Sequence, residues 1–169
     1  MNVNSILIVD DEVSIRDLLT EILKVKVGKI VSVESGSQAL KILSRDRFDI
    51  VLTDIKMPDM DGFQLLESIK KFIDPIVPVV VMTGYNSTYD RLEAKAKGAV
   101  EYIAKPFEQA DIIACIDKVM LKSLSERYEI ILKYITFANN LIAHSNDPNK
   151  DELAIIGKRL LKYIDTNSN

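Results

Sequence analysis

Five short apolar runs constrain the fold of this chain more than any other feature of its sequence. Val and Ile dominate the runs, and most of their residues are apolar at consecutive positions rather than at alternate ones. Such runs are typical of strands that are buried on both faces, as in a parallel sheet. The runs are Ile6–Val9, Ile30–Val33, Ile50–Thr53, Val77–Met82 and Val100–Ile103.

Helical patterns separate these runs. Apolar residues repeat at intervals of three and four along residues 15–23, 39–43 and 63–70. A more polar helix is expected from about residue 87 to residue 97, with Gly98 as its C-terminal stop. A fifth helix is expected to begin near residue 108. This alternation of strand and helix predicts a doubly wound α/β domain, with a five-stranded parallel sheet and helices on both faces.

The composition narrows the class of protein. A length of 169 residues suits one domain with a modest appendage, and a net charge of −3 gives no sign of a general nucleic-acid-binding surface. The single cysteine, Cys115, lies in an apolar helical pattern, which favours a core residue in a reducing compartment. No stretch approaches the roughly 20 apolar residues of a membrane helix. We therefore expect a cytoplasmic protein without membrane insertion.

Polar side chains follow four of the predicted strands, where ligands bind in doubly wound sheets. Asp10 and Asp11 follow the first strand, Asp54 the third, Thr83 the fourth and Lys105 the fifth. Carboxylates so close together repel each other, and a hard divalent cation bound by oxygen would neutralise them. Mg²⁺ fits best, because it accepts a few carboxylates and keeps several waters. Together with a lysine and a hydroxyl, these groups predict a site for phosphoryl transfer to an aspartate.

Four stretches of the sequence, in this order and spacing, resemble the receiver domains of two-component response regulators. The resemblance covers roughly residues 1–120, and it implies a flavodoxin-like fold and a receiver domain over residues 1–122. The stretches are Ile6–Glu12, Asp54–Gly62, Val80–Gly84 and Tyr102–Phe107.

The resemblance implies a role for each residue of the predicted phosphorylation site. Asp54 corresponds to the aspartate that accepts the phosphoryl group. Asp11 is implied as a direct Mg²⁺ ligand and Asp10 as a ligand that acts mainly through water. The backbone carbonyl of Lys56 is implied as a further ligand, and Lys105 as the lysine that binds the phosphoryl group.

The same resemblance implies a conformational switch. Thr83 corresponds to the switch hydroxyl, and Tyr102 to the aromatic residue that changes rotamer with it. The affected face would be built from the fourth helix, the fifth strand and the fifth helix. The peptide bond before Pro106 is expected to be cis, as is usual in the family.

Simpler interpretations of these residues stay open. Asp10 and Asp11 also suit a helix N-cap ahead of Val13. Thr83 also suits an ordinary strand end, and Tyr102 a static, partly buried tyrosine.

The last part of the chain follows no output domain that the resemblance covers. Apolar residues repeat at helical spacing over residues 121–144 and again over 153–164, and residues 146–149 form a turn signal. This pattern predicts a helical hairpin in an extension over residues 123–169. So short a hairpin cannot easily bury both apolar stripes alone. It is expected to pack on a second copy in a homodimer, on its own receiver domain, or on another protein.

We therefore expect a signalling protein rather than an enzyme. It would receive a phosphoryl group on Asp54 from a histidine kinase or phosphotransfer protein, with Mg²⁺ as cofactor. It would signal by protein–protein contact, through the switch face and the C-terminal helices, and either surface is a possible homodimer interface.

Two other functions stay open as alternatives. The first is a DNA-binding transcriptional regulator that uses the C-terminal helices, although Lys158, Arg159 and Lys162 are few basic residues for that role. The second is a metal-dependent phosphohydrolase with Asp54 as nucleophile. Such enzymes usually carry a second acidic residue two positions later, where this chain has Lys56.

Overall fold

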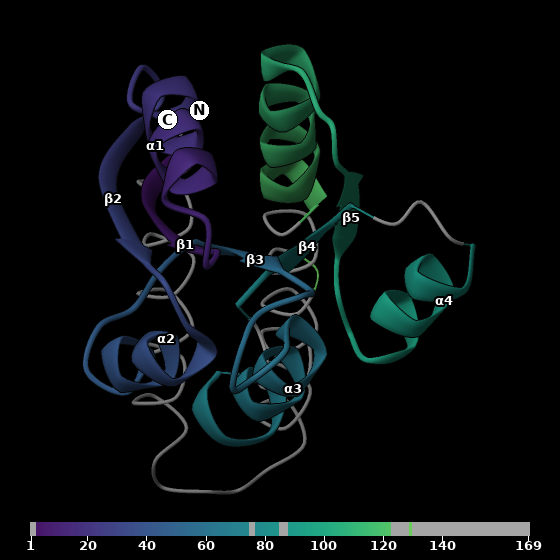
Figure 1. Ribbon diagram of the computed structural model, residues 1–169. Helices are drawn as coiled ribbons and strands as arrows, with labels where there is room; N and C mark the ends of the chain where they lie inside the picture. Colours follow the sequence, from purple (N-terminus) through teal and green to yellow (C-terminus); the bar gives the residue numbers. More distant parts are fainter. Residues whose placement is uncertain (1–2, 75–76, 85–87, 123–128, 130–169) are drawn as a thin grey trace, which may run out of the picture. The chain divides into compact units, whose positions relative to one another are not determined.

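The computed structural model describes residues 3–74, 77–84, 88–122 and 129 (Figure 1). Contacts divide the chain into two compact units, Met1–Met120 and Leu121–Asn169. The predicted helical hairpin lies outside the described residues, so the division at residue 122 stays a prediction. The elements are β1 (Val3–Val9), α1 (Val13–Leu23), β2 (Val27–Val33), α2 (Gly36–Leu43), β3 (Ile50–Asp54), α3 (Gly62–Ser68), η1 (Ile69–Ile73), β4 (Val79–Thr83), α4 (Thr88–Ala96), β5 (Glu101–Ala104) and a helix over 109–122.

The five strands form one parallel sheet in the order β2-β1-β3-β4-β5. This order confirms the predicted doubly wound, flavodoxin-like fold, because each crossover carries a helix to one face or the other. Two strands are longer than predicted at their N-terminal ends. β1 starts at Val3, which pairs with Val27 of β2, and the sequence gives no apolar run over this first part of either strand.

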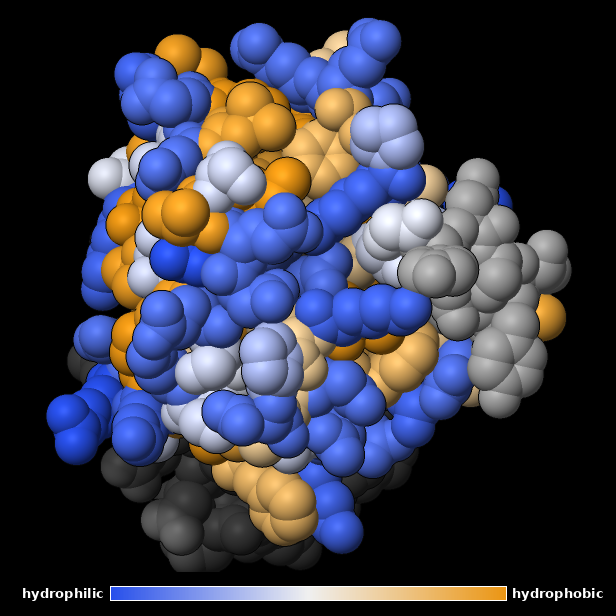
Figure 2. Space-filling model, in the orientation of Figure 1, coloured by the Kyte–Doolittle hydropathy of each residue, from blue (hydrophilic) through white to orange (hydrophobic). Residues whose placement is uncertain are grey.

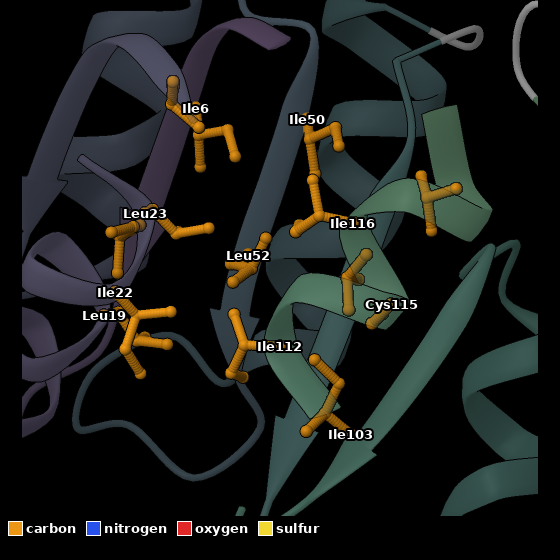
Figure 3. Packing of buried hydrophobic residues seen from close by; sticks show 14 of the residues in the cluster. Ile6, Leu19, Ile22, Leu23, Ile50, Leu52, Ile103, Ile112, Cys115 and Ile116 are labelled. Atoms are coloured by element: carbon orange, nitrogen blue, oxygen red, sulfur yellow. The ribbon is translucent and has the colours of Figure 1, made fainter. Parts of the chain in front are cut away.

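The sheet separates two apolar layers, since successive side chains of a strand point to opposite faces. In β1, Ile6 and Ile8 belong to one layer, and Leu7 and Val9 to the other. Figure 1 shows α1 and helix 109–122 over the first face, and α2 and α3 over the second. In Figure 3 the side chains of α1 and helix 109–122 converge above the central strands. The labelled residues of this layer are Ile6, Leu19, Ile22, Leu23, Ile50, Leu52, Ile103, Ile112, Cys115 and Ile116.

The end of α3 differs from the prediction of one regular helix over residues 63–70. The helix passes at Ile69 into a π-helical turn, closed by the Asp74 amide, which donates to the Ile69 carbonyl at 2.9 Å. Ile69 is fully buried, whereas Phe72 is 72% exposed. The wider turn therefore keeps Ile69 in the core and leaves the aromatic ring outside.

Gly98 ends α4 as predicted. Its φ of +94° lies in the left-handed region that glycine adopts without steric cost. Hydrophilic residues cover most of the face seen in Figure 2, with apolar residues showing between them in patches. Within the described part of the chain, the helices are too short or too polar to cross a membrane.

Candidate functional site

The register of the sheet brings three of the predicted site residues to one edge. Asp54, the last residue of β3, pairs with Met82 of β4, and Thr83 is the next residue of that strand. Thr83 pairs with Ala104 of β5, and Lys105 follows directly. The carboxyl ends of β3, β4 and β5 therefore present Asp54, Thr83 and Lys105 side by side, next to the end of β1.

Lys105 joins two buried carboxylates. Its Nζ lies 2.7 Å from Oδ1 of Asp54 and 2.8 Å from Oδ2 of Asp10. The side chain of Asp10 is fully buried, and that of Asp54 is 7% exposed. One ammonium therefore compensates two carboxylates that are nearly removed from water, and the pairing leaves a net negative charge.

The second oxygen of each carboxylate accepts a backbone hydrogen bond. Oδ2 of Asp54 accepts from the Lys56 amide at 2.7 Å, and Oδ1 of Asp10 accepts from the Glu12 amide at 3.0 Å. Each aspartate thus accepts one hydrogen bond from an amide of its own loop and one from Lys105. This arrangement fixes the carboxylates relative to one another before any ligand binds.

The electrostatics of the site follow from burial and from this shared ammonium. Burial raises the pKa of Asp54 above its usual 3.8, and the hydrogen bond and charge of Lys105 oppose that shift without cancelling it. The negative charge of Asp10 adds to the rise. Burial lowers the pKa of Lys105, but its hydrogen bonds to Asp10 and Asp54 outweigh that effect and leave the pKa raised. The lysine is therefore charged at neutral pH.

The loop from β3 to α3 closes against the backbone of Asp54. The Gly62 amide donates to the Ile55 carbonyl at 2.8 Å, and a Cβ added at Gly62 would lie 2.1 Å from the carbonyl oxygen of Asp54. Asp61 caps α3 through a reciprocal capping box with Gln64. No role for Gly62 was predicted from the sequence. The sequence signal for such a role is the position of Gly62 at the start of a predicted helix, directly after the capping residue Asp61.

The predicted switch residues lie on β4 and β5. Thr83 is buried at 1% exposure, and its carbonyl accepts from the Lys105 amide at 2.7 Å. Tyr102 is half-buried, and the guanidinium carbon of Arg91 lies 5.6 Å from the centre of its ring. The contact between Arg91 and this tyrosine was not predicted from the sequence. The Lys105–Pro106 bond is cis, as predicted.

The predicted group of three carboxylates is only partly assembled. Asp10 and Asp54 come together under Lys105, whereas Asp11 is exposed. Among the residues that the structure describes, no three acidic, histidine or cysteine side chains lie close enough to hold a metal ion together. The oxygen donors and the excess negative charge nevertheless suit a hard divalent cation. The Mg²⁺ site thus stays a prediction whose donor chemistry fits these residues.

Comparison with known proteins places the chain in one family. The family model of the response regulator receiver domain matches residues 6–117. Sporulation initiation phosphotransferase F of Bacillus subtilis is 40% identical over 119 residues, which cover 70% of this chain and 95% of that protein. Response regulator protein FleR of Pseudomonas aeruginosa is 35% identical over 119 residues, covering 70% of this chain and 25% of that protein.

Solved structures give the same result. The chemotaxis response regulator CheY4 of Vibrio cholerae matches with a TM-score of 0.66 and 27% identity, over 70% of this chain and 99% of that one. NtrX from Brucella abortus matches with a TM-score of 0.73 and 31% identity, over 78% of this chain and 30% of that one. The chain spans about a quarter of the length of the first curated relatives it matches. Phosphorylation on an aspartate and signalling by conformational change are typical of these proteins, and the chain belongs to the response regulator receiver family.

Proposed function

We propose that Asp54 accepts a phosphoryl group and that the chain signals its phosphorylation state by protein–protein contact. The observation that carries the proposal is the Lys105 ammonium, held 2.7 Å from Asp54 and 2.8 Å from Asp10 at the carboxyl edge of the sheet. An ammonium in this position is ready to bind an anion on Asp54 without any rearrangement of the strands. Membership of the receiver family supplies the reaction.

The transfer needs only a nucleophile and stabilisation of charge. An oxygen of Asp54 attacks the phosphorus of a phosphohistidine or a small phosphodonor, an acyl phosphate bond forms, and the bond to the donor's leaving group breaks. When bound, Mg²⁺ neutralises charge on the transferring phosphoryl oxygens. We propose that Asp11, Asp10, Asp54 and the carbonyl of Lys56 hold it. Lys105 then exchanges its contact with the carboxylate for one with the phosphoryl oxygens.

The proposed response to phosphorylation starts from Thr83. Its hydroxyl lies on the strand next to Asp54 and would donate to a phosphoryl oxygen. Movement of Thr83 opens space next to β5, into which Tyr102 turns, and this changes the face of α4, β5 and helix 109–122. A local charge change is in this way coupled to a protein-binding surface. A shift from 1:99 to 99:1 between two states requires about 5.5 kcal/mol of differential stabilisation.

A phosphorylation assay with intact-mass measurement tests the assignment of Asp54. Incubation with acetyl phosphate and Mg²⁺ is expected to add one phosphoryl group to the parent chain and none to Asp54→Asn. Asp46→Asn is the matched control, because Asp46 is exposed on the loop that leads into β3 and is expected to leave labelling unchanged. Equal labelling of parent and Asp54→Asn would exclude Asp54 as the acceptor.

The proposed partners follow from the family. A histidine kinase or a phosphotransfer protein would supply the phosphoryl group, and the chain would act in the cytoplasm. The relative from Bacillus subtilis favours a second candidate role, since that protein is named a phosphotransferase and almost all of it is matched. In that role Asp54 would pass its phosphoryl group on to another protein. DNA binding stays the weaker alternative, because Lys158, Arg159 and Lys162 are few basic residues for that role. These residues lie outside the described part of the chain.

We also propose that the extension over residues 123–169 drives self-association. The apolar stripes of its sequence are too large for a hairpin of this length to bury alone. Light scattering at several concentrations is expected to give a dimer mass for the full chain and a monomer mass for residues 1–122. The highest concentration is about 100 μM, well above the dissociation constant of a dimer of ~1 μM affinity. A full chain that is still monomeric there would contradict the proposed self-association.

A further inference from the structure

Arg16 reaches back from α1 to the two acidic residues that precede the helix. Its Nη1 donates to the backbone carbonyl of Asp10 at 2.8 Å and to that of Asp11 at 3.0 Å. The arginine is half-buried. A guanidinium is therefore fixed against the peptide groups that carry both of the acidic side chains proposed for the cation site.

Arg16 holds the turn before α1 through its carbonyl groups, and a capping side chain does not add to this hold. The N-cap residue of α1 is Glu12, and its side chain makes no capping hydrogen bond. Asp10 is held on one side, where its amide donates to the Val33 carbonyl at 3.2 Å and its Oδ1 accepts from the Glu12 amide at 3.0 Å. Asp11 is exposed, and Arg16 donates a side-chain hydrogen bond to its backbone carbonyl. Arg16 therefore holds the backbone of Asp11 at its carbonyl group.

We propose that Arg16 is a positioning residue for the divalent-cation site: it locks the β1–α1 turn so that the carboxylates of Asp10 and Asp11 point to the same side. This inference rests on the proposed function, because it takes these aspartates as the residues that hold Mg²⁺. Arg16 touches neither the cation nor the phosphoryl group. Residues that do not bind the metal but orient its ligands through hydrogen bonds typically contribute ten- to a hundredfold to metal affinity.

The charge of Arg16 makes the proposal easy to test, because two physical effects predict opposite results. If Arg16 acted only through its positive charge, its removal would strengthen Mg²⁺ binding, since a cation near the site repels a second one. If it acts by holding the turn, its removal weakens Mg²⁺ binding, since Asp11 then has to be ordered when the metal binds. The sign of the change therefore separates positioning from electrostatics.

The experiment is a titration of the full, unphosphorylated chain with MgCl₂, followed by NMR shifts of backbone amides at the site. Arg16→Met is expected to raise the Mg²⁺ dissociation constant by about tenfold or more. Arg16→Lys retains a donor that can reach the carbonyls and is expected to recover part of the loss. Arg45→Met is the matched control, because Arg45 is exposed on the loop before β3, at the other end of that strand, and is expected to leave the dissociation constant unchanged.

A second readout separates a positioning role from a general loss of structure. In metal-free protein, Arg16→Met is expected to speed hydrogen exchange of the Glu12 amide while leaving the amides of β3 and β4 protected. Mg²⁺ binding by Arg16→Met that equals or exceeds that of the parent would overturn the inference. So would an affinity loss accompanied by exchange throughout the sheet. A parent chain that binds no Mg²⁺ would overturn the proposed metal site itself, whereas normal binding by both proteins overturns only the role of Arg16.

Discussion

Replacement of Gly62 by alanine is expected to lower the free energy of unfolding by about 3 kcal/mol. The added Cβ would lie 2.1 Å from the Asp54 carbonyl oxygen and 2.9 Å from the Asp54 carbonyl carbon. Both are backbone atoms of a strand that is buried along its whole length, so neither can move aside as the end of a side chain would. The first turn of α3 must shift instead, and the hydrogen bond from Gly62 to Ile55 is strained.

Urea unfolding followed by circular dichroism measures this effect. Gly84→Ala provides the control, since a Cβ at Gly84 meets no described atom within 4 Å. Its free energy of unfolding is expected to stay within about 0.5 kcal/mol of the parent value. Equal midpoints for Gly62→Ala and the parent would show that α3 can retreat from β3 at little cost.

Replacement of Lys105 by methionine is expected to destabilise the metal-free protein at pH 7.5 by about 3 kcal/mol, because it leaves the buried carboxylates of Asp10 and Asp54 without their cation. This stability deficit, the difference in the free energy of unfolding between the parent and Lys105→Met, should depend on pH. Burial already raises the pKa of Asp54, and loss of the ammonium that opposes this shift raises it further.

The sign of the pH dependence follows from that raised pKa. A carboxyl group with a raised pKa in the folded state favours folding while it is protonated, and this contribution is lost as the pH rises through the folded-state pKa. The deficit of Lys105→Met should therefore grow above the ordinary pKa of 3.8 and shrink as the pH is lowered toward that value. Added MgCl₂ should restore part of the stability at pH 7.5, since a divalent cation can replace the ammonium.

Urea titrations at pH 5.0 and 7.5 in EDTA, and at pH 7.5 in MgCl₂, check these expectations. Lys118→Met is the matched control, because Lys118 is an exposed lysine whose ion pair with Glu101 lies at the surface. It should change stability little and without the same pH dependence. A deficit of Lys105→Met that is constant from pH 5.0 to 7.5 would mean that the two aspartates do not depend on this ammonium.

The sequence predicted the fold and the edge of the sheet that carries the site, because both depend on pattern alone. Consecutive Val and Ile residues mark buried parallel strands, and the residues after each run necessarily meet at one edge. The distances between these side chains could not be predicted from the sequence. It expected three carboxylates together, whereas the structure brings Asp10 and Asp54 under Lys105 and leaves Asp11 exposed. Which oxygen a lysine contacts depends on side-chain packing between strands that lie far apart in the chain.

The contacts made by the loops could not be predicted from the sequence either. Arg16 looks like an ordinary polar position on an amphipathic helix, and only the turn before α1 brings the two carbonyls within its reach. Gly62 is one glycine among six, and its importance depends on how closely α3 approaches β3. The π-helical turn over Ile69–Ile73 interrupts a periodicity that was regular in the sequence. In each case the deciding interaction joins backbone to backbone or side chain to backbone, which residue patterns do not record.

The order of the strands also bears on aggregation. β2 and β5 are the two edges of the sheet, and an open edge can recruit a strand from another molecule. β5 has only four residues, and β2 carries the exposed Lys29, so neither edge offers a long uncharged template. Copies of this chain are therefore expected to join through helices and side chains rather than by extending the sheet. A phosphorylation signal can then alter an association surface without creating a seed for fibrils.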